Sequence, residues 1–98
     1  MIEIIRSDEF VSWVRSLRDR VAAMRITARI ERAAHGNLGD WKALRDGVCE
    51  MRVDVGAGYR VYFMRRGQAV VILLCGGDKR TQDADIARAV GLAKRWEN

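Results

Sequence analysis

The stretch that decides the fold is Val48–Arg80, VCEMRVDVGAGYRVYFMRRGQAVVILLCGGDKR. Apolar and polar residues alternate over 48–55, and the segment 59–64 is rich in aromatic and β-branched residues; both patterns are typical of strands. The segment 69–75 is apolar without interruption, which indicates a central strand covered on both faces. We therefore predict three consecutive strands in this stretch.

Two turn signals join these strands. Gly56-Ala57-Gly58 supplies the positive-φ freedom that a hairpin connection needs, and Arg66-Gly67 closes the second strand. Strict alternation then directs the Arg52 side chain away from the core. Arg60 lies on the strand face opposite its apolar neighbours Tyr59, Val61 and Phe63.

Four basic residues lie where the strands could bring them together, and they are Arg52, Arg60, Lys79 and Arg80. Our hypothesis is that these cations meet on one face or edge of a small sheet and grip a nucleic-acid phosphate. The alternative is that the two strand arginines pair across strands with Glu50 or Asp54, which is common in half-exposed sheets.

Length and composition predict a single domain spanning residues 1–98. With 98 residues, 49% hydrophobic residues and no proline, the chain is large enough to bury one core without disulfides or metals. Cys49 and Cys75 both lie in expected strands and lack metal-ligand spacing, so we expect buried thiols in a reducing compartment. We expect no cofactor and no metal.

The charge balance predicts an anionic partner. A net charge of +5 and a pI near 9.9 favour RNA, DNA or an acidic protein, without choosing among them. The longest apolar run is far shorter than the about 20 residues of a membrane span, and the start MIEIIRSDEF lacks signal-peptide features. We therefore expect a cytoplasmic protein without a membrane partner.

Apolar residues at helical spacing predict three helices, after a short strand at Met1–Arg6. Ser7, Asp19 and Thr81 are the expected N-caps, and Gly36 is the expected left-handed residue after the second helix. The three apolar stripes are Phe10, Trp13, Val14 and Leu17; Ala23, Ile26, Ile30 and Ala33; and Ile86, Ala89, Val90, Ala93 and Trp96. The last stripe needs a partner surface, either the sheet of its own chain or another protein.

Two further groups of residues have a structural and a functional interpretation. Arg20, Arg25, Arg29 and Arg32 of the second helix lie largely outside its stripe, which indicates a solvated face or, alternatively, contact with nucleic-acid backbone. His35 is the only histidine, but its position at a helix C-terminus favours a partner for free carbonyls over a general base. Trp41–Arg45 is a short extended lead into the sheet.

The order of elements and three motifs resemble the RelE/ParE toxin superfamily of bacterial toxin-antitoxin modules. The motifs are E-x-R-x-D around Arg52, GYRVYF at Gly58–Phe63, and GGDKRTQ at Gly76–Gln82, continuing to Ile86. The closer similarity is to the small subgroup called addiction-module killer proteins, near the HigB and RelE branches. The resemblance covers essentially the whole chain.

This resemblance implies an α+β fold, in which a strand and two N-terminal helices pack with a small, mainly antiparallel sheet and a C-terminal helix follows. It also implies a type II toxin that is neutralised by a cognate antitoxin and cleaves messenger RNA, on the ribosome, as a metal-independent endoribonuclease. The complex would bind operator DNA through the antitoxin. Arg60 falls on the arginine of the GYR motif, Arg52 on a basic position of the preceding strand, and Lys79 and Arg80 on the basic pair after the last strand.

The implied reaction needs fixed cations, because charge builds on the phosphate oxygens as the RNA 2′-hydroxyl attacks phosphorus. The planar fork of Arg60 or Arg52 suits those oxygens, and Lys79 is the expected proton-transfer group. The C-terminal helix lacks the tyrosine that RelE carries there, so the general acid and base stay open. Two alternatives are a ParE-like inhibitor of DNA gyrase acting by protein contact, and a catalytically degenerate antitoxin-binding module.

Overall fold

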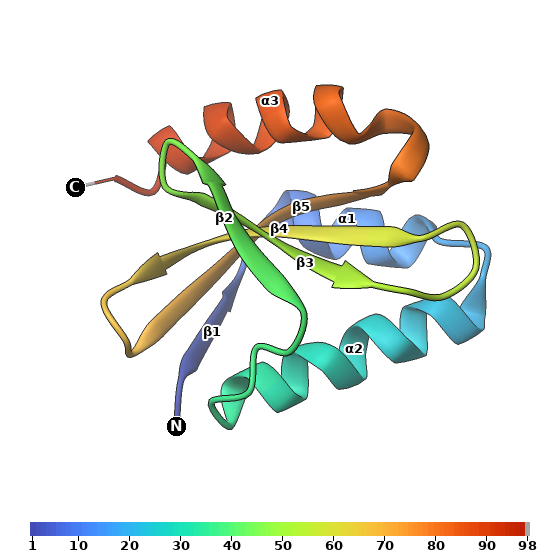
Figure 1. Cartoon of the computed structure of the whole chain (residues 1–98), viewed down its shortest axis with the longest axis horizontal. Coiled ribbons are helices and arrows are strands. Elements are labelled where there is room, and N and C mark those ends of the chain that lie inside the picture. The colour runs from blue at the N-terminus through green and yellow to red at the C-terminus, as the bar shows by residue number, and fades with distance from the viewer. Residues whose placement is uncertain (98) are drawn as a thin grey trace.

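Residues 48–78 form three consecutive antiparallel strands at the centre of a five-stranded sheet, in a computed structural model that describes residues 1–97. The elements are β1 (Glu3–Arg6), α1 (Asp8–Ser16), α2 (Arg20–Ala34), β2 (Trp41–Arg45), β3 (Val48–Val53), β4 (Tyr59–Arg66), β5 (Val70–Asp78), a 3-10 turn (Lys79–Thr81) and α3 (Gln82–Lys94). The sheet order is β1-β5-β4-β3-β2, with β1 parallel to β5 and the other pairs antiparallel (Figure 1). The predicted α+β fold is confirmed.

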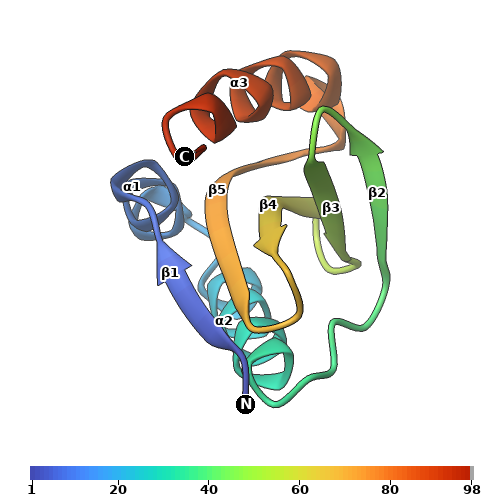
Figure 2. The same cartoon turned by 90° about the vertical axis from the view of Figure 1, so that its left-hand side faces the viewer.

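Helices cover both faces of this sheet. Helices α1 and α2 lie on one face and α3 lies on the other, as the two views of Figures 1 and 2 show. The chain places β1 and β2 at the two edges, so the N-terminal part contributes a strand as well as cover. Within residues 1–97, no helix is both long and apolar enough to cross a membrane.

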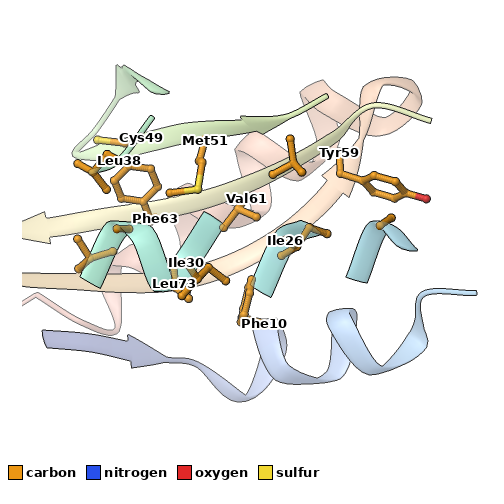
Figure 3. Close-up of a cluster of buried hydrophobic side chains, with 14 residues drawn as sticks. Phe10, Ile26, Ile30, Leu38, Cys49, Met51, Tyr59, Val61, Phe63 and Leu73 are labelled. Atoms are coloured by element: carbon orange, nitrogen blue, oxygen red, sulfur yellow. The ribbon is translucent and has the colours of Figure 1, made fainter. Parts of the chain in front are cut away.

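The larger core lies between the sheet and the two N-terminal helices (Figure 3). Alternate residues of β3 and β4 form the sheet side of this core. Two of them, Met51 and Val61, are paired across the strands and are fully buried. The helix side of the core consists of Ile26 and Ile30 from α2 and Phe10 from α1. The predicted apolar stripes of both helices are therefore confirmed as core faces.

The second core lies between the sheet and α3. It shows which surface the apolar stripe of the last helix packs against. Its buried members are Val48, Tyr62, Ile72, Leu74 and Cys75 from the sheet and Ala89, Leu92 and Ala93 from α3. The stripe packs on the sheet of its own chain. Helix α3 therefore covers the sheet face that points away from α1 and α2.

All three predicted N-cap residues occupy the N-cap positions of their helices, but only Ser7 and Asp19 make a side-chain capping bond. The side-chain oxygens of Ser7 and Asp19 accept hydrogen bonds from the amides of Phe10 and Ala22, each at 3.0 Å. Thr81 makes no capping bond; its hydroxyl donates instead to Asp85 Oδ2 at 2.5 Å. The reason is that the chain enters α3 through a 3-10 turn.

A β-bulge in β5 decides which face its last residues point to. Tyr62 pairs with Cys75 but Phe63 pairs with Leu73, so Leu74 is the extra residue. After the bulge, a Cβ at Gly76 would collide with Trp13 of α1, and a Cβ at Gly77 would collide with Asp85 of α3. The glycine pair therefore lets one helix approach each face closely at the same point of the strand.

Arg29 joins α2 to the sheet. Its Nη1 donates to the carbonyl of Arg52, and its Nη2 donates to the carbonyls of Leu38 and Asp40 at 3.1 and 3.4 Å. Burial and the charge of Arg32 lower the pKa of Arg29. At this position, then, an arginine of the α2 face holds the chain together rather than standing free in solvent.

Candidate functional site

Arg52 and Arg60 lie directly opposite each other on β3 and β4. Their neighbours two residues along, Glu50 and Tyr62, are also a directly opposed pair. Directly opposed residues of antiparallel strands project to the same face, so all four side chains lie on the face that α3 covers. This is where two of the predicted site residues come together.

One carboxylate lies between the two guanidinium groups. Arg60 Nε is 3.5 Å from Glu50 Oε1, and Arg52 Nε is 3.6 Å from Glu50 Oε2. Both distances are those of ion pairs and are longer than ordinary hydrogen bonds. The cross-strand pairing with Glu50 that the sequence left as an alternative is therefore present for Arg60, whereas Arg52 pairs with Glu50 along the same strand, β3.

The two arginines differ in accessibility. The Arg60 side chain is only 10% exposed, whereas that of Arg52 is 43% exposed. Arg60 also donates from Nη1 to the carbonyl of Tyr59 at 3.2 Å. Arg52 is thus the guanidinium that a large ligand reaches first, and Arg60 forms the base of the site.

Helix α3 contributes its first residue to the same cluster. Gln82 Nε2 donates to Glu50 Oε1 at 2.9 Å, and Glu50 itself has no exposed surface. A buried carboxylate requires compensating partners, and here they come from three elements, β3, β4 and α3. The start of α3 is consequently fixed against the arginine pair.

Tyr62 brings an unpartnered hydroxyl to this cluster. Within residues 1–97, neither the Tyr62 hydroxyl nor Glu50 Oε2 has a hydrogen-bond partner. Burial, and secondly the negative charge of Glu50, raise the pKa of the Tyr62 phenol well above its usual value. The phenol therefore stays protonated across the physiological range.

Lys79 reaches the same end of the sheet from the turn after β5. Its backbone amide donates to the carbonyl of Gly58 at 3.1 Å, two residues before Arg60 in the chain. The aliphatic part of its side chain lies over Gly58, where an added Cβ would come within 2.6 Å of Lys79 Cε. Lys79 is exposed and forms no ion pair within residues 1–97.

Arg80 stands apart from the other three cations. Its Nη2 is 3.0 Å from Asp78 Oδ2, and its side chain is 83% exposed. The paired guanidinium lowers the pKa of Asp78, and the carboxylate in turn raises the pKa of Arg80. The structure thus brings Arg52 and Arg60 together, places Lys79 at the same end of the sheet, and gives Arg80 a partner of its own.

Glu50 and Gln82 belong to this site although the sequence analysis did not assign them to it. Glu50 was visible as a possible ion-pair partner, and Gln82 as the last residue of the GGDKRTQ motif. The apolar stripe of the last helix left open whether it packs on the sheet or on another protein, so the contact between Glu50 and Gln82 could not be predicted. Arg52, Arg60 and Lys79 with the single carboxylate of Glu50 leave a formal charge of +2, which suits an anionic ligand.

Comparison with known proteins identifies the family. Residues 12–95 match the family described as phage derived protein Gp49-like (DUF891), which is associated with toxin-antitoxin modules. The chain is also 48% identical over 93 residues to an uncharacterized protein of Haemophilus influenzae, covering 95% of this chain and 94% of that one. The family match covers strands β2 to β5, helices α2 and α3 and every residue of the site, and it leaves out the edge strand β1. The chain therefore belongs to the Gp49-like family of phage-derived proteins.

Proposed function

We propose that this protein is the toxin of a type II toxin-antitoxin module, that it cleaves messenger RNA on the ribosome without a metal, and that a cognate antitoxin neutralises it. The association of its family with toxin-antitoxin modules supports the first part. The observation that carries the nuclease activity is the opposed pair Arg52 and Arg60 at an accessible sheet end, beside the exposed Lys79.

In this reaction the RNA 2′-oxygen attacks the adjacent phosphorus. A bond forms between the 2′-oxygen and phosphorus, the bond from phosphorus to the 5′-oxygen breaks, and the products are a 2′,3′-cyclic phosphate and a 5′-hydroxyl. Negative charge grows on the non-bridging oxygens in the transition state. Arg52 and Arg60 stabilise that charge more strongly than they stabilise the ground state, which is how a fixed cation accelerates the step.

Lys79 donates the proton that the departing 5′-oxygen takes up. Its stem is anchored over Gly58, two residues before Arg60, and an anchored proton donor contributes typically 10²–10⁴-fold in rate. The 2′-hydroxyl proton passes to solvent. Arg80, on the exposed turn next to Lys79, contacts a neighbouring phosphate of the RNA backbone, which adds affinity without base preference.

The cognate antitoxin is the protein partner in this proposal, and its complex with the toxin is the form that binds operator DNA. The apolar stripe of α3 packs on the sheet of its own chain, so it is not the surface that binds the antitoxin. An acidic antitoxin segment meets the exposed cations Arg52, Lys79 and Arg80 instead. A complex with the product of the adjacent gene should then weaken as salt is raised.

Expression of the chain alone tests the proposal. Incorporation of labelled amino acid should fall before DNA synthesis does, and primer extension should map new 5′ ends in a reporter transcript. Arg52→Ala should reduce cleavage about a hundredfold or more. The matched control is Arg45→Ala on edge strand β2, where the arginine is paired with Asp46 at 3.3 Å and both are exposed. Failure of DNA synthesis first would overturn the nuclease proposal in favour of a gyrase inhibitor, and no effect on either process would favour a degenerate module. Full cleavage by a folded Arg52→Ala protein would overturn the assignment of the activity to this site.

A further inference from the structure

We infer that Glu50 is a positioning residue, which holds Arg52 and Arg60 by their Nε edges so that their outer nitrogens are available to one phosphate. This inference rests on the proposed nuclease function and names a further residue for the same site. It starts from a single relationship, a carboxylate whose two oxygens each face the Nε of a different guanidinium, at 3.5 and 3.6 Å.

The nitrogen through which each arginine contacts Glu50 decides which of its N–H donors remain available to a ligand. A guanidinium offers five N–H donors, and contact through Nε leaves the donors of Nη1 and Nη2. Within residues 1–97, Arg52 makes no side-chain hydrogen bond, and Arg60 uses only Nη1, toward the carbonyl of Tyr59. Outer donors of both arginines are therefore free for phosphate oxygens.

The charge of the cluster also fits one phosphodiester. Two guanidinium groups and one carboxylate leave a single positive charge, and a phosphodiester carries a single negative charge. Without Glu50 the two arginines, directly opposed across the strands, would repel each other and separate. With Glu50 they are held as one unit that accepts one anion.

Glu50 acts through the arginines and does not contact the RNA itself. Its side chain has no exposed surface, and Gln82 of α3 fixes Oε1 through a hydrogen bond at 2.9 Å. The carboxylate is therefore buried and held, as expected for a group that orients other groups. A carboxylate acting directly on the substrate would instead need an open path to the 2′-hydroxyl.

A positioning role and plain electrostatics predict opposite signs for Glu50→Gln. If charge alone matters, removal of a negative charge beside the phosphate should tighten binding of RNA and should also speed cleavage, because the transition state is more negative than the ground state. If Glu50 positions the arginines, single-turnover cleavage should instead slow, on the order of tenfold to a hundredfold, because misplaced donors stabilise the transition state poorly. Binding of an uncleavable 2′-O-methyl oligoribonucleotide should stay equal or become tighter in the same variant.

The experiment compares wild type, Glu50→Gln, Glu50→Asp and Asp54→Asn in single-turnover cleavage on ribosomes and in anisotropy titrations with that oligoribonucleotide. Asp54→Asn is the matched control, because it removes one exposed carboxylate two residues after Arg52 and should not slow cleavage. Glu50→Asp keeps the charge, but its shorter side chain cannot hold both Nε groups, so partial loss is expected.

The outcomes separate the role of Glu50 from the proposed function. Slow cleavage with undiminished binding in folded Glu50→Gln supports it. Wild-type rates in that variant, or equal losses of cleavage and binding, overturn it. If neither Glu50 variant gives a cooperative thermal melt, the carboxylate is a requirement for folding and the positioning role is rejected. Absence of cleavage by the wild type itself contradicts the proposed function and not the role of Glu50.

Discussion

The side chain of Lys79 lies across Gly58, and the amide of Lys79 donates to the carbonyl of the same glycine. Gly58 has φ +79°, which a side chain rarely adopts, and its missing Cβ is the space that the lysine stem occupies. A turn glycine between β3 and β4 therefore sets the place of a cation that arrives from β5.

We expect Gly58→Ala to displace Lys79 and reduce RNA cleavage about as much as Lys79→Ala does. Gly67→Ala in the β4–β5 turn is the matched control, since Gly67 also has positive φ (+59°) but has no atom within 4 Å of an added Cβ. Both alanine variants should lose about 1 kcal/mol of stability from the strained backbone. Cleavage rates of the two variants, beside urea unfolding curves, separate the effects. Equal activity in both would show that the place of the lysine does not matter.

Replacement of Arg60 by alanine should destabilise the fold much more than replacement of Arg52. Arg60→Ala leaves the buried Glu50 without its buried partner, so a loss of about 3–5 kcal/mol in the free energy of unfolding is expected. Arg52→Ala removes a half-exposed pair and should change stability by less than about 1 kcal/mol. Both should lower cleavage, and Arg60→Lys should restore it only in part because an ammonium lacks the fork.

A double variant shows whether the Arg60 effect passes through Glu50. Combining Arg60→Ala with Glu50→Gln should recover part of the lost stability, because no uncompensated buried charge remains. The measurement is a double-mutant cycle from urea unfolding. Strictly additive losses would mean that the ion pair between the two side chains contributes nothing.

Tyr62→Phe should not destabilise the protein. The hydroxyl that it removes is buried without a hydrogen-bond partner within residues 1–97, and burying such a group costs roughly 1–3 kcal/mol. Equal or higher stability in urea unfolding is therefore the expected result, with cleavage unchanged. A clear loss of stability would mean that the hydroxyl has a bound partner in solution.

Stability should decline in alkali. Burial raises the pKa of Cys75 from 9.0 to about 11, and it raises the pKa of Cys49 in the same direction. The unfolded chain therefore releases these protons first, so their contribution to stability is complete below pH 9.0 and is lost as pH rises toward about 11. Chemical unfolding at pH 7, 9 and 10.5 measures this decline, and Cys75→Ala should make it shallower. An identical slope in Cys75→Ala would exclude this thiol as the cause.

Local patterns were sufficient to predict most of the elements. Alternation in β3 and β4, the apolar run of β5 and the caps Ser7 and Asp19 each act over a few residues, so they can be seen without knowledge of the whole chain. The same patterns predicted that Arg52 and Arg60 share the side of the sheet away from the N-terminal helices.

What covers that side could not be predicted, because alternation indicates a face and not its neighbour. Glu50 and Arg60 are buried on the sheet face that α3 covers, and the sequence of α3 is only weakly amphipathic. Helix α3 begins after Thr81 as the pattern predicted, but the 3-10 turn before it, which Asp78 caps, was not predicted. The place of the bulge was equally hidden within an uninterrupted apolar run.

That bulge divides β5 into two parts whose side chains alternate between the sheet faces in opposite order. The first part, up to Leu73, pairs with β1, and the second part, from Cys75, pairs with the segment of β4 that carries Arg60. Ser7 is hydrogen-bonded to the residues between the two parts. Its amide donates to the carbonyl of Leu73 at 3.1 Å and its hydroxyl to that of Leu74 at 2.7 Å. The residue that begins α1 thus also fixes where the order of alternation changes, so the orientation of Gly77 opposite Arg60 depends on a hydroxyl about seventy residues away in sequence.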